Sequence, residues 1–149
     1  MALAIFDLDN TLLAGDSDHA WGEFLVNQGL VDAQEFKDKN DYYYHQYQQG
    51  ALDIHEYLEF ALQPLTQHPL DQLHALRSQF VDEIIRPMVT DKSRELLRKH
   101  QEQGDYLLII TATNLFVTQP IAELLGVDDI IATEPEMIDG EYTGKVAGV

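Results

Sequence analysis

The feature that most constrains the fold is a short, uninterrupted apolar run near the start of the chain, Leu3–Phe6, which ends at Asp7. A run of this length without alternating polar residues is typical of a strand that is buried on both faces of a parallel sheet. We therefore expect Leu3–Phe6 to be a strand of such a sheet, with Asp7 at its carboxyl end.

Two further apolar runs extend this into a repeating pattern of strands and helices. The first, Asp105–Thr111, follows a helical pattern over Thr90–Gln103. The second, Ile130–Ala132, follows a helical pattern over Leu115–Leu125 that Gly126 ends. Strands that alternate with helices form βαβ units, in which the strands are parallel. The sequence therefore predicts an α/β fold built on a Rossmann-like parallel sheet.

Helical patterns fill the segment between the first two strands. Ser17 is the expected N-cap of a helix that contains Trp21. Asp53 is the expected N-cap of another helix, which Pro64 ends. A further apolar stripe stops at Pro87, and the polar stretch before Asp53 is also expected to be helical. The segment is therefore expected to contain helices and no strand.

These patterns divide the chain into two parts. We predict that residues 14–87 form an inserted α-helical cap, and that residues 1–13 and 88–149 form the α/β core. Near the end of the chain, Met137–Tyr142 contains an Asp-Gly pair, which is typical of a two-residue β-hairpin turn.

Composition excludes several classes of function. The 149 residues include no cysteine, which excludes disulfides, thiolate zinc sites and cysteine nucleophiles. The net charge of −17 disfavours nucleic acid and anionic membranes as partners. No apolar run approaches the length of about 20 residues that spans a bilayer. Because the first residues contain no basic n-region, we expect no signal peptide and a cytoplasmic location.

Asp7 and Asp9 follow the first predicted strand directly and are separated by one residue. Ligands of open parallel sheets bind beyond the carboxyl ends of the strands, so this position favours a functional role over a structural turn. One carboxylate can attack phosphorus to form an aspartyl-phosphate, while the other reaches the leaving-group oxygen. Because the protein and a phosphate are both negative, a divalent cation is expected at the reacting centre.

Thr111 stands at the end of the second predicted strand, just before the helix that begins near Leu115. Its hydroxyl and the backbone N–H groups that follow could hold a phosphate, as the N-termini of helices do. An N-cap is the alternative role for a threonine in this position.

The segment Asp7-Leu8-Asp9-Asn10-Thr11, together with Thr111, resembles motifs I and II of the haloacid dehalogenase (HAD) phosphatases. The resemblance implies that Asp7 is the nucleophile, and that Asp9 protonates the leaving group and then activates water. It also implies a Mg²⁺ ion held by the Asp7 carboxylate and the Asp9 backbone carbonyl. The phosphate-binding residues that it implies are Asn10, Thr111, Ala112 and Thr113.

Residues Leu12–His19 and Gly140–Gly144 resemble the HAD subgroup with a helical cap between the two motifs. This subgroup includes phosphoserine phosphatases and histidinol-phosphatase-like proteins, and the resemblance covers essentially the whole chain. It implies a small phosphorylated metabolite as substrate, either histidinol phosphate or phosphoserine, and the Asp16–His19 stretch favours the former. His19 is a candidate substrate contact, with a plain surface histidine as the alternative.

Several other side chains have weaker patterns. Glu134 follows the third predicted strand and lies either at the rim of the site or in solvent. A tyrosine run, Tyr42–Tyr44 with Tyr47, could line a pocket, but we favour packing between helices. The remaining histidines show no metal-ligand spacing and are expected at the surface: His45, His55, His68, His74 and His100.

Two elements that the resemblance implies are not found, a lysine that neutralises the phosphate and an acidic cluster after a fourth strand. Asp128 and Asp129 precede the third strand, and Lys145 has no helix to hold it, so we assign neither role. The chain is therefore similar to a HAD phosphatase without its last third. An inactive fragment or a phosphate-binding domain is an alternative to an enzyme. A phosphoacceptor domain is another, which Asp9 disfavours. We further expect Leu3–Phe6 to be an exposed sheet edge, so that the chain either self-associates or is markedly less stable than a longer form.

Overall fold

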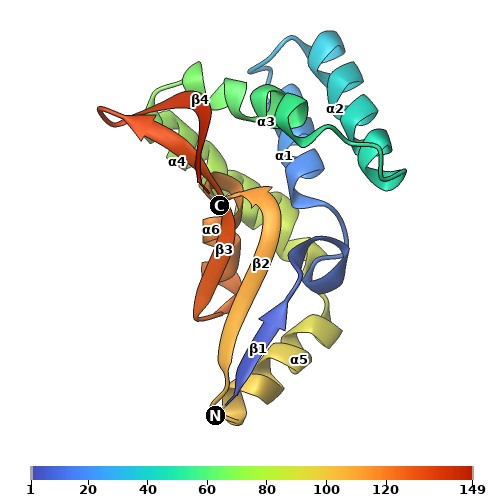
Figure 1. Cartoon of the computed structure of the whole chain (residues 1–149), viewed down its shortest axis with the longest axis vertical. Coiled ribbons are helices and arrows are strands. Elements are labelled where there is room, and N and C mark those ends of the chain that lie inside the picture. Colours follow the sequence, from blue (N-terminus) through green and yellow to red (C-terminus); the bar gives the residue numbers. More distant parts are fainter. Residues whose placement is uncertain (1, 149) are drawn as a thin grey trace.

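The computed structural model describes residues 2–148, which form one sheet and a set of helices (Figure 1). The strands are β1 (Leu3–Phe6), β2 (Tyr106–Asn114), β3 (Asp129–Ile138) and β4 (Glu141–Gly148), and they follow one another across the sheet in that order. β1 pairs with β2 and β2 with β3 in parallel, whereas β4 is antiparallel to β3. The predicted α/β fold with a mainly parallel sheet is confirmed.

The helices beside the parallel strands begin and end close to the predicted residues. α5 (Asp91–Glu102) is capped by Thr90, whose side chain accepts a hydrogen bond from the N–H of Ser93. α6 (Leu115–Leu125) ends at Gly126, which has a φ of 72° that favours glycine. Local sequence therefore sets the bounds of both helices.

The sheet is buried on one face only, so the expected burial of the first strand on both faces is wrong. Phe6, Leu107 and Ile109 belong to the core, whereas Leu3 and Ile5 on the opposite face are 58% and 56% exposed. The physical reason is topological. Two parallel crossovers that advance in the same direction across a sheet place α5 and α6 on the same face.

A hairpin extends the sheet beyond its parallel part. β3, which was predicted to end at Ala132, continues to Ile138 because its second half pairs with β4. The predicted turn is confirmed: Asp139 and Gly140 have φ angles of 53° and 80°, as a type I′ turn requires. Pro135, which has no N–H to donate, lies at an irregularity in this pairing.

The segment between β1 and α5 is helical, as predicted. Its helices are α1 (Ser17–Asn27), α2 (Ala33–Gln48), α3 (Ile54–Leu62) and α4 (Leu70–Phe80), and its shorter turns are η1 (Leu8–Leu12), η2 (Gln63–Thr66), η3 (Val81–Ile85) and η4 (Arg86–Met88). No helix within residues 2–148 is long and apolar enough to cross a membrane.

The caps of these helices match the sequence in one case and differ in another. Asp53 caps α3 as expected, by accepting hydrogen bonds from the N–H groups of His55 and Glu56. The cap of α1 is Asp16, not Ser17, because the Asp16 carboxylate accepts the N–H of His19.

The two ends of the helical segment lie side by side. Leu13 and Val89 form an isolated antiparallel bridge, and the N–H of Ala14 donates to the carbonyl of Met88 over 2.8 Å. These contacts stand at the boundaries predicted for residues 14–87, and that division into cap and core stays a prediction. A shared hydrophobic core nevertheless runs through both parts.

Candidate active site

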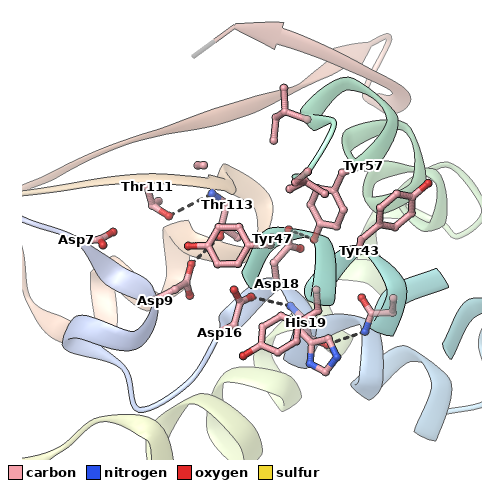
Figure 2. A pocket seen from close by; sticks show the side chains of 15 residues that line it. Asp7, Asp9, Asp16, Asp18, His19, Tyr43, Tyr47, Tyr57, Thr111 and Thr113 are labelled. Atoms are coloured by element: carbon pink, nitrogen blue, oxygen red, sulfur yellow. Dashed lines mark hydrogen bonds between the residues drawn. The ribbon is translucent and has the colours of Figure 1, made fainter. Parts of the chain in front are cut away.

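A cavity of about 170 Å³ lies between the carboxyl ends of β1 and β2 and the helices α1, α2 and α3 (Figure 2). Its wall on the sheet side is formed by Asp7, Asp9, Thr111, Ala112 and Thr113. Its wall on the helical side is formed by Asp16, Asp18, His19, Asn40, Tyr43, Tyr44, Tyr47, Leu52, Ile54 and Tyr57.

Asp7 enters the cavity because it is the first residue after β1. The register of the parallel pair places Phe6 opposite Ile109, so the chain leaves β1 beside the end of β2 that carries Thr111. One oxygen of the Asp7 carboxylate, Oδ1, accepts the N–H of Leu8 over 3.0 Å. Asp7 is exposed, so its other oxygen can face a ligand.

Asp9 is held in place by hydrogen bonds to both of its carboxylate oxygens. The N–H of Ser17, the first residue of α1, donates to Oδ1 over 2.7 Å. The hydroxyl of Thr113 donates to Oδ2 over 2.8 Å. The Asp9 side chain is therefore fixed in the wall of the cavity before any ligand binds.

Thr111 and Thr113 lie in an irregular part of β2. The register of β2 against β3 shifts between Ile110 and Asn114, so the intervening residues leave the regular ladder. The Thr111 hydroxyl accepts the N–H of Thr113 over 3.2 Å, which leaves its own proton available to a phosphate oxygen.

The helix after this strand begins at the predicted residue, but the strand before it is longer than predicted. α6 starts at Leu115, and the N-cap is Asn114, whose side chain accepts the N–H of Val117. The N–H groups next to Thr111 therefore belong to the irregular strand and not to the first turn of a helix. The strand continues further than predicted because Asn114 still pairs with Thr133 of β3.

Of the other two predicted site residues, His19 lines the cavity and Asn10 does not. His19 lines the cavity, but its ring nitrogens lie 3.1 Å from carboxylate oxygens of Glu23 and Asp41. Asn10 does not line the cavity, and its N–H donates to the carbonyl of Gly15 over 2.9 Å. A phosphate held by Asn10 would have to use its side chain.

Three charged side chains that the sequence left without an assigned role lie away from the cavity: Glu134, Lys145 and Asp128. Glu134 is exposed within β3 and not after it, because that strand continues to Ile138. Lys145 is exposed on β4. Asp128 instead has a structural role, since its carboxylate accepts the N–H of Leu107 over 2.8 Å. None of these side chains lines the cavity.

For the tyrosines that form the aromatic wall, pocket lining was only the less favoured alternative from the sequence. Tyr43, Tyr44 and Tyr47 line the cavity, although we favoured helix packing for them; Tyr43 does both, since its ring also contacts Tyr57. The spacing in the sequence could have shown that they share a surface. Asn40 and these three tyrosines recur at i, i+3, i+4 and i+7, which is one face of α2. Asp16 and Asp18 were noted only as part of a family resemblance.

Asp18 and Tyr57 join α1 to α3 at the helical end of the cavity. The Tyr57 hydroxyl donates to the Asp18 carboxylate. Burial raises the pKa of Asp18 to about 7, although the hydrogen bond from Tyr57 acts in the opposite direction. Burial, followed by the charge of Asp9, also raises the pKa of Asp16. The helical end of the cavity is therefore a place where negative charge is costly.

The oxygen ligands of the cavity fit a weakly held magnesium ion. Within residues 2–148, no three His, Cys, Asp or Glu side chains are grouped so that they could hold a metal. Asp7 and Asp9 offer hard oxygen atoms, which Mg²⁺ prefers, and Mg²⁺ usually keeps several water ligands. Two protein ligands are compatible with such an ion but do not complete its shell.

Comparison with known proteins identifies relatives over nearly the whole chain. A family model for haloacid dehalogenase-like hydrolases matches residues 4–149. The chain is 44% identical over 147 residues to the histidinol-phosphatase of Neisseria meningitidis, and 30% identical over 153 residues to a phosphoserine phosphatase of Mycobacterium tuberculosis. These matches cover 98% and 99% of this chain, but 66% and 49% of the two relatives.

Solved structures give the same picture. A protein of unknown function from Bordetella pertussis matches with a TM-score of 0.91 and 42% identity, over 99% of this chain and 66% of that one. A substrate-bound phosphoserine phosphatase matches with a TM-score of 0.68 and 18% identity, over 99% of this chain and 62% of that one, which shows a shared fold. The chain thus spans about half to two thirds of the proteins that it matches.

Proposed function

Because the chain belongs to the haloacid dehalogenase-like hydrolases, we propose that it supplies the nucleophilic half of a Mg²⁺-dependent phosphatase that hydrolyses a small phosphate monoester. The observation that carries the proposal is the position of Asp7 and Asp9 beside Thr111 in one cavity. This reaction needs a nucleophile, an acid/base and a hydrogen-bond donor to the phosphate, which are the roles proposed for Asp7, Asp9 and Thr111.

The proposed reaction has two steps. A carboxylate oxygen of Asp7 attacks phosphorus, the bond from phosphorus to the ester oxygen breaks, and Asp9 gives its proton to the leaving oxygen. Water then attacks the aspartyl-phosphate, Asp9 takes the proton of that water, and inorganic phosphate leaves Asp7. The Thr111 hydroxyl donates to a phosphate oxygen throughout, and the two hydrogen bonds on Asp9 keep it aimed at the leaving group.

The proposal includes a metal and a cellular setting. Asp7 through its carboxylate and Asp9 through its backbone carbonyl would hold Mg²⁺, which when bound would neutralise charge on the transferring phosphoryl group.

Histidinol phosphate and phosphoserine are the proposed substrates, because relatives that act on each are similar to this chain. We also propose residues 14–87 as the cap and the cytoplasm as the location.

A phosphate-binding domain without turnover is the second candidate. It is favoured by one specific observation: none of the nine lysine and arginine residues lines the cavity within residues 2–148. Transfer of a phosphoryl group without a lysine or arginine leaves much of its charge unstabilised.

The free edge of the sheet, at β1, is a candidate surface for a protein partner. β1 pairs only with β2 among the described strands, so one side of its backbone is unpaired. Leu3 and Ile5 beside that edge are more than half exposed. We propose that a second copy of this chain covers the edge, since unpaired strands template association with an identical strand.

A phosphatase screen over small phosphate monoesters, with and without Mg²⁺, tests the proposed function. We expect turnover that requires Mg²⁺ and that falls by several orders of magnitude in Asp7→Asn. Asp91→Asn is the matched control, because Asp91 is exposed on α5, outside the cavity. Phosphate binding with no turnover would favour the second candidate, and equal activity in wild type and Asp7→Asn would contradict the assigned nucleophile.

A further inference from the structure

The helical end of the cavity is acidic. Asp16 and Asp18 both line it, and they share the cavity with Asp7 and Asp9 (Figure 2). Within residues 2–148, no lysine or arginine lines any part of the cavity. A ligand whose far end carried a carboxylate would therefore meet like charges and no counter-ion.

The same end of the cavity has an aromatic wall. Tyr44, Tyr47 and Tyr57 contribute rings, and the His19 ring lies 4.4 Å from that of Tyr44 between their centroids. Aromatic faces attract cations, with the strongest effect where water is excluded. His19 adds no free donor for a carboxylate, because its two nitrogens already lie beside Glu23 and Asp41. Aromatic faces and carboxylates together suit a positively charged group.

Asp18 has a polar partner but no ionic one. Its hydrogen bond comes from the neutral hydroxyl of Tyr57, and no positively charged side chain of the described residues forms an ion pair with it. A partly buried carboxylate without a cation is costly to ionise, and a cation brought by a ligand would remove that cost. Asp16 uses Oδ1 to cap α1, which leaves Oδ2 for a ligand.

We propose that this end of the cavity selects phosphate esters whose alcohol part carries a positive charge and no carboxylate, with Asp16 and Asp18 as the specificity-determining residues. The inference rests on the proposed function, because the phosphate of the same ester must lie at Asp7. It separates the two proposed substrates: an amine or imidazolium without a carboxylate is favoured, and an amino acid phosphate is disfavoured.

Three small esters of similar length test the proposal. 2-Aminoethyl phosphate carries a positive charge, ethyl phosphate carries none, and phosphoserine adds a carboxylate to the amine. We expect kcat/KM to fall in that order, with a difference of at least about tenfold between the first and the last, as one charge contact is worth. Asp18→Asn should reduce the preference for 2-aminoethyl phosphate over ethyl phosphate by about tenfold, and Asp16→Asn should reduce it less.

Binding gives a readout that does not depend on turnover. Calorimetry of the three esters with Asp7→Asn in Mg²⁺ should give affinities in the same order, with Kd lowest for 2-aminoethyl phosphate and highest for phosphoserine. Asp91→Asn should keep the wild-type order of kcat/KM, and Asp91→Asn combined with Asp7→Asn should keep the order of Kd; circular dichroism shows whether each variant is folded. If Asp18→Asn is unfolded, the inference is tested instead by whether Asp16→Asn and Tyr57→Phe reduce the preference for 2-aminoethyl phosphate over ethyl phosphate. Failure of the wild type to hydrolyse any ester would overturn the proposed function, whereas equal kcat/KM or Kd for all three would overturn the inference alone.

Discussion

The hydroxyl of Thr113 donates a hydrogen bond to Oδ2 of Asp9 over 2.8 Å, although 104 positions separate the two residues in the chain. Thr113 lies in the irregular end of β2, and Asp9 lies in the turn that follows β1. The bond joins the two segments that line the sheet side of the cavity. The orientation of the proposed acid/base therefore depends on the pairing of β1 with β2.

Removal of the Thr113 hydroxyl should slow the chemical step. Thr113→Val keeps the shape of the side chain but cannot donate to Asp9, so we expect kcat to fall about 3- to 10-fold with little change in KM, as the loss of one hydrogen bond implies. Thr113→Ser keeps the donor and is the matched control. Steady-state kinetics measure both, and equal losses in the two variants would show that packing, not the hydrogen bond, matters.

Loss of the acid/base should depend on the leaving group. Asp9→Asn cannot protonate the leaving oxygen, so we expect a large fall in kcat for alkyl phosphates and a smaller one for aryl phosphates, whose oxygen needs little protonation. Comparison of ethyl phosphate with an aryl phosphate measures the difference. The same fall for both esters would show that Asp9 only positions other groups.

The pKa of Asp18 predicts a pH-dependent stability difference. Because burial raises this pKa to about 7, the folded protein binds the proton more tightly than the unfolded chain, and the resulting stability is lost as pH rises from about 4 through about 7. Tyr57, Asp16 and Asp9 are the titratable groups that act on Asp18.

Asp18→Asn removes this titration, so its stability relative to wild type should increase between pH 4 and pH 8, by on the order of 4 kcal/mol. Urea unfolding at both pH values measures it. Asp91→Asn should show no such trend, and a pH-independent difference for Asp18→Asn would contradict the raised pKa.

Arg77 joins α4 to α6 and should therefore matter for stability. Pro120 within α6 has no N–H for the carbonyl of Phe116, and Nη1 of Arg77 on α4 donates to that carbonyl over 3.0 Å. Arg77 also lies over the Phe116 ring, 4.7 Å from its centroid. We expect Arg77→Met to lower the free energy of unfolding by about 1–3 kcal/mol, because a buried carbonyl loses its partner.

A second substitution tests the cause of that loss. Pro120→Ala restores an N–H to the helix, so the cost of Arg77→Met should be smaller in the Pro120→Ala background, by about 1 kcal/mol. Denaturant unfolding of the four proteins measures the coupling. Additive effects would show that the ring contact carries the stabilisation and that the carbonyl does not.

The exposed edge of β1 predicts self-association of the 149-residue chain. Sedimentation should show dimers that strengthen with added salt, because salt screens the repulsion between two chains of net charge −17. Ile5→Lys places a charge beside the edge and should weaken the dimer. Ile138→Lys is the matched control, since Ile138 is 58% exposed, close to the 56% of Ile5, but lies at the hairpin turn. A monomer at all salt concentrations, or equal effects of both variants, would contradict this role of the edge.

Local structure followed from residues that act on their near neighbours. Gly126 ends α6, Asp53 caps α3, and the Asp139-Gly140 pair makes the hairpin turn, each as predicted. Backbone angles and capping bonds at such positions depend on a few adjacent residues. The position of Asp7 at a strand end was predictable for the same reason, because the apolar run before it is local.

The helical wall of the cavity was decided by tertiary structure. Nothing near Asp18 in sequence shows that Tyr57 donates to it, since 39 positions separate them. The relative placement of the helices depends on packing such as that of Trp21 against Phe80 and Phe116, with ring centroids 5.2 Å and 5.7 Å apart.

The sequence also could not show which face of the sheet is exposed. An apolar run shows that Leu3 and Ile5 suit a buried strand, but their exposure depends on the side of the sheet that α5 and α6 occupy. The amino-acid sequence by itself therefore determined the order of the elements, the ends of α5 and α6, and the acids that follow β1. Only the tertiary structure decided which face is covered and which helices complete the cavity, because burial pattern specifies that a side chain is packed and not what packs against it.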